Sequence, residues 1–369
     1  MRVGENLNAA LGDLLERDPK AYVIGEDVLD PYGGAFKVTR GLSTRFPDRV
    51  LGTPISESGL SGLAAGLALC GDTAIVEIMF SDFVALAFDQ ITNFAAKSVS
   101  MYGSRVPMRL IVRCPTGGGR GYGPTHSQSL QKHFIGVPGL AVYEMSALHD
   151  NRTVLASMLA SAQPCVFFED KVLYTRRMHD LDPLFSRDAL SGGDGLSSGD
   201  AISGDENVGG GECDKSDGYG VRGFRDVGVV RDEVVRVFID DPAESDCVII
   251  APGGVADRAL AAMRRMFVER EVTCCLLVPS RLYPFDVEPL LSTLRNAKAI
   301  VIAEESTAGG TWGAEVAHRI HQHMWKNLSR PVALVHSADS VIPTAAHLEQ
   351  RVLLQESTIY AAILEALHD

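Results

Sequence analysis

The sequence has 369 residues, of which 46% are hydrophobic and 22% charged, so it is long enough to form two or three domains with sizeable cores. Its formal net charge of −13 at pH 7 argues against general binding to nucleic acids or to anionic membranes. It contains no apolar run of about 18 residues, no signal-peptide layout and no CxxC pair among its seven cysteines. We therefore expect a cytoplasmic protein with buried, reduced thiols and neither a nucleic-acid nor a membrane partner.

Residues 1–180 alternate short apolar runs with helical patterns, which predicts an α/β domain with a parallel sheet covered on both faces. The expected strands are the runs at 21–27, 49–52, 73–80, 107–114, 140–145 and 165–170. Helical patterns occupy residues 57–71, 82–103 and 150–162.

Residues 187–228 differ sharply in composition from the rest of the chain. Gly, Ser and Asp dominate this segment and few apolar groups are available for burial, so we interpret it as a low-complexity insert or linker. From 232 to 369 the strand and helix alternation returns, which predicts a second, smaller α/β domain at the C-terminus.

The segment from 53 to 71 reads as a turn followed by a helix. Ser56 is a plausible N-cap, and Glu57 falls in the first turn, where the helix dipole favours a carboxylate even without a catalytic role. Gly59, Gly62 and Gly66 lie on one helical face, and glycine there costs helix stability. Close approach of another helix or of a ligand would compensate for that cost.

Two further segments carry candidate functional groups. Phe80, Phe83 and Phe88 lie at a strand-to-helix junction, where aromatic residues are usually core but can also line a ring-binding surface. The strand at 107–114 leads into a glycine-rich loop that ends at His126 and lacks the GK[ST] signature of a phosphate loop. Parallel sheets bind ligands beyond the carboxyl ends of their strands, so His126 is a structural histidine or a well-placed catalytic one.

The order of these motifs resembles the pyrimidine-binding half of transketolase-like thiamine diphosphate enzymes. The segments are GEDV, GGAFKVTRGL, TPISESGLSGLAAGLAL, EIMFSDFVALAFDQI and GGRGYGPTHSQS. The similarity is greatest to beta subunits of the first component of pyruvate and branched-chain 2-oxo-acid dehydrogenases. PGGVADRAL, PFD, IAEESTAGGTWGAEVAHRI and IPTA resemble the C-terminal domain of that family, so that the resemblance covers all but the insert.

The resemblance implies a thiamine diphosphate site with named residues. Glu57 corresponds to the glutamate that hydrogen-bonds N1′ of the aminopyrimidine and promotes the tautomer that takes the proton from the thiazolium carbon. Phe83 corresponds to the aromatic residue that stacks on the pyrimidine, with Met79 and Ile55 in the same pocket.

Other positions follow from the same resemblance. His126 corresponds to the histidine that faces the reacting carbonyl, and Glu26 to an acidic residue near a subunit interface. Family members can also hold a potassium ion through backbone carbonyls, which would here be those near Leu110, Ser161 and Gln163.

The diphosphate half of such a site is missing from this chain. The family holds Mg²⁺ and the diphosphate with a GDG segment followed by an NN pair, whereas Gly193, Asp194 and Gly195 lie in the insert with no NN pair after them. The resemblance therefore implies an alpha subunit that holds Mg²⁺, a second beta subunit in a heterotetramer, and a lipoyl acyltransferase that accepts the acyl group. The alternatives are a subunit of a split transketolase-like acyl- or ketol-transferring enzyme, or a non-catalytic scaffold subunit.

Overall fold

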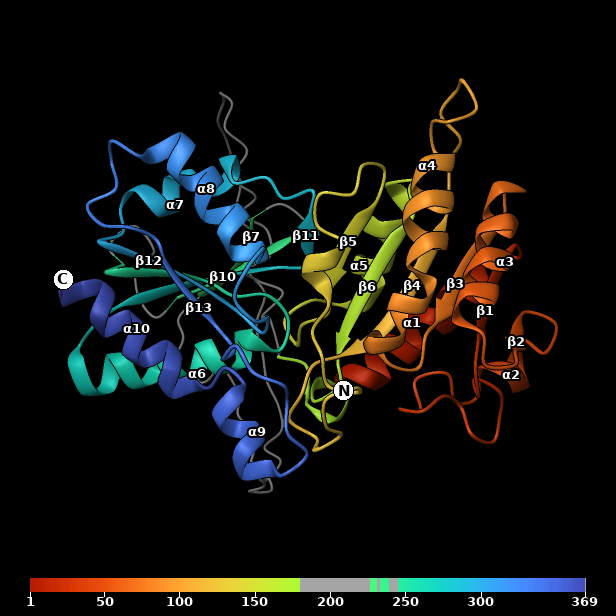
Figure 1. The fold of residues 1–369 in the computed structure, drawn as a ribbon, viewed down its shortest axis with the longest axis horizontal. Coiled ribbons are helices and arrows are strands. Elements are labelled where there is room, and N and C mark those ends of the chain that lie inside the picture. The colour runs from red at the N-terminus through yellow and green to blue at the C-terminus, as the bar shows by residue number, and fades with distance from the viewer. Residues whose placement is uncertain (180–225, 231–232, 239–244, 369) are drawn as a thin grey trace, which may run out of the picture.

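The computed structural model describes residues 1–179, 226–230, 233–238 and 245–368. Most of the predicted insert, including Gly193, Asp194 and Gly195, lies outside these residues. The described chain forms two lobes, each built on its own β-sheet, with the N-terminal lobe on the right of Figure 1 and the C-terminal lobe on the left. The predicted α/β fold with two domains of parallel-rich sheet is confirmed.

The first sheet has the strand order β11-β5-β6-β4-β3-β1-β2. All neighbours from β5 to β2 are parallel, and their apolar runs are buried, as expected for a sheet covered on both faces. Unexpectedly, β11 comes from the C-terminal half of the chain and pairs antiparallel with β5, so the second lobe contributes an edge strand to the first sheet. The strands are β1 (Ala21–Gly25), β2 (Val50–Gly52), β3 (Thr73–Glu77), β4 (Leu110–Thr116), β5 (Ala141–Glu144), β6 (Cys165–Asp170) and β11 (Arg281–Tyr283).

Helices cover both faces of this sheet. One face packs against α1 (Val3–Arg17) and α5 (Asn151–Ala160), and the other against α3 (Glu57–Leu69) and the helical segment from 81 to 98. That segment was predicted as one regular helix, but it runs as a 3₁₀ turn, a π turn and a short α turn. They are η1 (Ser81–Ala87), η2 (Gln90–Ala95) and α4 (Ala96–Ser98), and shorter turns are α2 (Leu42–Arg45), η3 (Gln131–His133) and η4 (Leu173–Thr175).

The second sheet has the order β13-β12-β9-β10-β8-β7, with β7 and β8 antiparallel and the others parallel. Helices α6 and α10 pack on one face and α7 and α8 on the other. The strands are β7 (Asp226–Val230), β8 (Val234–Phe238), β9 (Cys247–Ile250), β10 (Cys274–Pro279), β12 (Ala299–Glu304) and β13 (Ala333–His336). The helices are α6 (Val255–Arg270), η6 (Glu288–Leu290), α7 (Leu291–Arg295), α8 (Trp312–Met324), α9 (Ala346–Val352) and α10 (Glu356–His368).

The boundary between insert and second domain differs from the prediction. We placed the insert at 187–228 and the domain at 232–369, but β7 begins at Asp226 and pairs with β8. The apolar residues of Asp226–Val230 extend the second sheet by one strand, which the polar composition of the preceding residues concealed.

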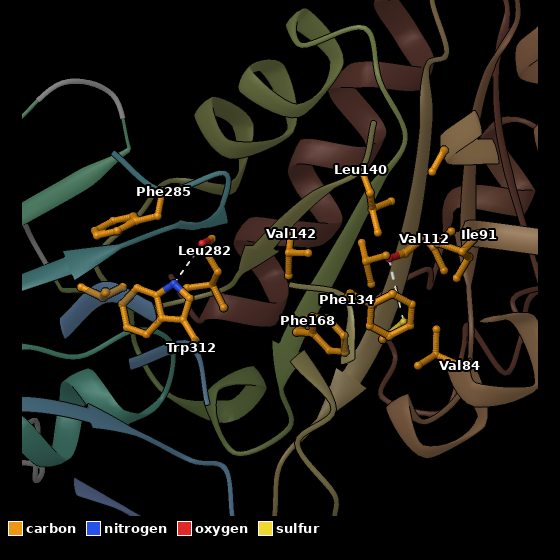
Figure 2. Packing of buried hydrophobic residues seen from close by; sticks show 14 of the residues in the cluster. Val84, Ile91, Val112, Phe134, Leu140, Val142, Phe168, Leu282, Phe285 and Trp312 are labelled. Carbon is orange, nitrogen blue, oxygen red and sulfur yellow. Dashed lines mark hydrogen bonds between the residues drawn. The ribbon is translucent and has the colours of Figure 1, made fainter. Parts of the chain in front are cut away.

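One hydrophobic cluster continues through both lobes. Figure 2 shows Phe134 and Phe168 of the first lobe packing in the same cluster as Leu282, Phe285 and Trp312 of the second. The buried Trp312 indole N–H donates to the Leu282 carbonyl at 2.9 Å, which satisfies its one polar group. This shared core brings residues of the second lobe against the loop that follows β4.

Candidate active site

Glu57 opens α3 and lies beside Glu26, which follows β1 directly. The Glu57 residue is only 7% exposed, yet its carboxylate has no hydrogen-bond partner among the described residues. The Ser56 N–H donates to Glu26 Oε1 at 3.3 Å. Burial, and then the neighbouring charge of Glu57, raise the pKa of Glu26. The carboxyl groups of Glu26 and Glu57 therefore lie near each other in a largely buried position at the end of β1.

Aromatic rings surround His126. The ring centroids of Phe80 and Phe83 lie 4.9 and 5.2 Å from that of His126, and both rings stand edge-on to the imidazole. Met79, just after β3, is half-buried, whereas Ile55 is 78% exposed in this single chain. The structure therefore brings Phe83 and His126 together, and it leaves Ile55 facing solvent.

His126 ends a loop whose shape depends on glycine. Gly119 and Gly121 have φ angles of +85° and +68°, a backbone region that other residues adopt only with strain. The Thr125 hydroxyl lies 3.0 Å from His126 Nδ1, which leaves Nε2 free for a ligand among the described contacts. After this loop comes a short 3₁₀ turn at Gln131–His133.

The predicted potassium ligands are engaged within the chain. The Ser161 carbonyl accepts a hydrogen bond from Arg105 Nη2 at 3.3 Å, so a guanidinium cation already serves that oxygen. The Gln163 carbonyl accepts from the Cys165 thiol at 3.4 Å, and Leu110 begins the buried strand β4. The role of these residues in binding potassium stays a prediction.

A buried ion-pair network lies beneath the site and was missed at the sequence level. Arg113 donates from Nη1 to Glu77 and from Nε to Glu169, both at 2.7 Å, and the Tyr174 hydroxyl donates to Glu169 at 2.6 Å. Burial opposes the charge of Arg113, but the two carboxylates outweigh it and hold the pKa of Arg113 above its usual range. Charged residues inside the apolar runs at 73–80, 107–114 and 165–170 were the available signal.

Lys171 is the second residue that sequence reasoning passed over. Its side chain is fully buried directly after β6, and its ammonium has no hydrogen-bond partner among the described residues. Nζ lies 5.5 Å from the centre of the Phe80 ring. Burial lowers the pKa of Lys171 to about 8, against the opposing charges of Asp82 and Asp170.

A cavity of about 510 Å³ opens beside the glycine-rich loop. Its lining residues are Gly119, Arg120, Tyr122, Val172, Thr175 and Arg176. The Tyr122 ring centroid lies 5.8 Å from that of Phe80, so the cavity borders the aromatic cluster around His126. Two of the six lining residues, Arg120 and Arg176, are basic.

Several negative observations concern the described residues only. They contain no group of three His, Cys, Asp or Glu side chains arranged to hold a metal ion. Within the same part of the chain, no helix is long and apolar enough to span a membrane. The six cysteines that the structure describes are free thiols, and all except Cys70 are buried.

Comparison with known families identifies two matches along the chain. Residues 1–177 match the family described as "Transketolase, pyrimidine binding domain", and residues 237–359 match "Transketolase, C-terminal domain". The first covers the lobe with Glu57, Phe83 and His126, and the second covers most of the other lobe.

Individual relatives span nearly the whole chain. It is similar to "Pyruvate dehydrogenase E1 component subunit beta" of Rickettsia conorii, with 28% identity over 98% of this chain and 96% of that protein. It is 30% identical to "2-oxoisovalerate dehydrogenase subunit beta 2, mitochondrial" of Arabidopsis thaliana, over 93% of this chain and 83% of that one. A solved structure titled "Split gene transketolase, inactive beta4 tetramer" matches with a TM-score of 0.65 and 20% identity over 100% and 98% of the two chains, which shows the shared fold.

Proposed function

Because this chain belongs to the family of beta subunits of 2-oxo-acid dehydrogenase first components, we propose that it supplies the pyrimidine half of a thiamine diphosphate site. The proposed enzyme decarboxylates a 2-oxo acid and transfers the acyl group to a lipoyl group on a partner acyltransferase. The observation that carries this proposal is Glu57, a residue only 7% exposed whose carboxylate has no hydrogen-bond partner among the described residues. Its hydrogen-bonding capacity is left for a ligand.

The residues present fit an aminopyrimidine ring. Glu57 offers a carboxyl group to a ring nitrogen, and Phe83, on the neighbouring helical turn η1, offers an aromatic face. When bound, thiamine diphosphate supplies a carbon nucleophile that attacks the keto group of the substrate. The role of Glu57 is then to hold a proton at N1′ of the pyrimidine, where its partly dry surroundings strengthen the hydrogen bond.

His126 completes the reacting side. Since Nδ1 is engaged by the Thr125 hydroxyl, Nε2 is the nitrogen that remains for the substrate. We assign it to the carbonyl oxygen or carboxylate of the 2-oxo acid, where a positioned imidazole donates a hydrogen bond or moves a proton. The rings of Phe80 and Phe83 lie nearly perpendicular to the imidazole and pack against it, which limits its rotation.

The diphosphate half of the site belongs, in this proposal, to an alpha subunit that also holds Mg²⁺. In support, the outer face of α3 is open: Leu63 is 54% exposed, and a Cβ on Gly66 would meet nothing within 4 Å among the described residues. This open face is where we propose that a helix of the partner approaches. We propose an α2β2 assembly, and the solved relative of similar fold that its title describes as an inactive beta4 tetramer is in line with a need for another chain.

The test is turnover of the chain alone and with its cognate alpha subunit. We expect release of CO₂ from a 2-oxo acid only from the mixture with thiamine diphosphate and Mg²⁺, and acyl transfer only when a lipoyl acceptor is added. Ketol transfer to an aldose without any lipoyl requirement would favour the split transketolase alternative. Absence of any cofactor-dependent turnover in the mixture would favour the scaffold alternative.

A further inference from the structure

The glycine-rich loop is held by carboxylates from the other lobe. Glu349 Oε1 accepts hydrogen bonds from the Gly119 N–H at 2.9 Å and from the Gly121 N–H at 3.3 Å, and Oε2 lies 3.1 Å from the same Gly121 nitrogen. Glu349 lies on α9 and is only 3% exposed, although its helix has seven residues and sits near the end of the chain. A buried carboxylate with two backbone donors is a strong, directional contact.

A second carboxylate repeats the arrangement one residue earlier. Glu305, directly after β12, accepts from the Gly118 N–H at 2.9 Å and pairs with Arg258 at 2.6 Å. Burial opposes the ionisation of Glu305, but Arg258 and the Gly118 N–H outweigh it and lower the pKa of Glu305. Three amides of the loop, those of Gly118, Gly119 and Gly121, therefore donate to two acidic side chains of the C-terminal lobe.

The segment before α9 adds steric contact. A Cβ on Gly123 would lie 2.6 Å from Thr344 Oγ1, and one on Gly121 would lie 3.2 Å from the Thr344 carbonyl oxygen. Thr344 belongs to the IPTA motif at 342–345, so this motif and Glu349 act on the same loop. The loop runs from the end of β4 to His126, and Gly119 also lines the cavity beside that histidine.

From this geometry we propose that Glu349 is a positioning residue of the active site, acting through the loop that carries His126. This inference rests on the proposed function for the role of His126, but the contact itself does not. Glycines at positive φ lose much conformational freedom when ordered, and the carboxylate offsets that loss by fixing the amides of Gly119 and Gly121. A loop released from Glu349 would sample other shapes and displace the imidazole from the substrate, and small displacements of a catalytic group lower the rate strongly.

The first arm of the test measures the loop directly. Amide hydrogen exchange of residues 117–126 is followed by mass spectrometry in the full chain, for wild type, Glu349→Ala, Glu349→Gln and the control Glu356→Ala. Glu356 lies on α10, pairs with Arg265 at 3.5 Å and does not contact the loop. Loss of hydrogen bonds to a charged acceptor should speed exchange in the loop about tenfold or more in Glu349→Ala, less in Glu349→Gln, and not at all in Glu356→Ala.

The second arm measures catalysis in the reconstituted enzyme. We expect kcat for decarboxylation to fall about tenfold or more in Glu349→Ala, with partial rescue in Glu349→Gln, while the thiamine diphosphate concentration for half-activation stays within about threefold. Unchanged hydrogen exchange of the loop in Glu349→Ala would show that Glu349 does not hold the loop. Faster exchange with unchanged kcat would show that holding the loop does not position His126. If Glu349→Ala fails to fold, the isosteric Glu349→Gln decides by the same two readouts. Hydrogen exchange of the loop is measured without substrate. A wild-type chain without 2-oxo-acid decarboxylation would therefore count against the proposed function and not against the contact between Glu349 and the loop.

Discussion

Two kinds of buried glutamate in the first lobe show how the same residue type serves different roles. Glu77 and Glu169 are buried and share the guanidinium of Arg113, and Glu169 also accepts from Tyr174. Glu57, on the adjoining helix, is nearly as buried but has no partner among the described residues. A satisfied carboxylate stabilises the fold, whereas an unsatisfied one leaves its hydrogen-bonding capacity for a ligand. Substitution of Arg113, the partner of Glu77 and Glu169, should therefore affect stability, whereas substitution of Glu57 should affect activity.

The largest effect is expected from Arg113→Met, and it should fall on stability. Removing the guanidinium leaves Glu77 and Glu169 buried without their cation, which costs about 3–5 kcal/mol of unfolding free energy. Urea denaturation of the purified chain measures the loss. Arg109→Met is the matched control, because Arg109 is 55% exposed and lies 3.9 Å from Asp18, and it should change stability by less than about 1 kcal/mol. Equal effects of the two substitutions would mean that the network does not hold the strand ends together.

The next largest effect is expected from Glu57→Gln, and it should fall on activity. The amide keeps the shape of the side chain but cannot exchange a proton with the pyrimidine, so decarboxylation by the reconstituted enzyme should fall about 100-fold or more. Stability should change by no more than about 1 kcal/mol, the contribution of a first-turn carboxylate. Glu315→Gln, in the first turn of α8, is the control for that dipole contribution. Activity within a few-fold of wild type, with normal exchange of the thiazolium proton by NMR, would remove Glu57 from the mechanism.

The contrast between these glutamates also shows what sequence reasoning could reach. The runs of apolar residues located nearly every strand of the first sheet, and the motifs around Glu57 and His126 could single out these two residues as site candidates because their spacing is local; their roles stay predictions. The partners of Arg113 and Glu349 could not be found in this way. Those contacts depend on which strands become neighbours and on how the second lobe docks, and single-sequence periodicity carries no information on either. The antiparallel edge strand β11 escaped prediction for the same reason.

A smaller effect is expected on the open face next to Glu57. Gly66→Leu fills a position where a Cβ would meet nothing within 4 Å in the part of the chain that the structure describes, and it replaces glycine by a good helix former. The isolated chain should therefore gain up to about 1 kcal/mol of stability, while association with the alpha subunit should weaken about tenfold because the bulkier side chain blocks close approach. Ala261→Leu, at an exposed position of α6, is the control. Titration of labelled alpha subunit measures the affinity, and unchanged binding by Gly66→Leu would place the partner elsewhere.

The last effect, on the pH dependence of stability, concerns Glu144, a buried glutamate of a third kind that has no ion pair among the described residues. Burial, and then the charge of Asp170, raise the pKa of Glu144 to about 8 from an ordinary value of 4.5. The folded state thus binds this proton more tightly than the unfolded chain, so the stability that it contributes is fully present below about pH 4.5 and is lost as pH rises through 8.

Glu144→Gln keeps the neutral shape at every pH. Between pH 6 and pH 9 the melting temperature of wild type should fall further than that of the variant, by roughly 2–4 °C for each 1 kcal/mol of difference. Gln131, Asp170, Glu304 and Glu305 face the same carboxyl group and are unchanged in the variant, so the difference between the two curves reports Glu144 together with its effect on these neighbours. Parallel curves across this range would show that Glu144 is ionised in the folded protein at neutral pH, and the division into paired, open and neutral glutamates would then lose its third member.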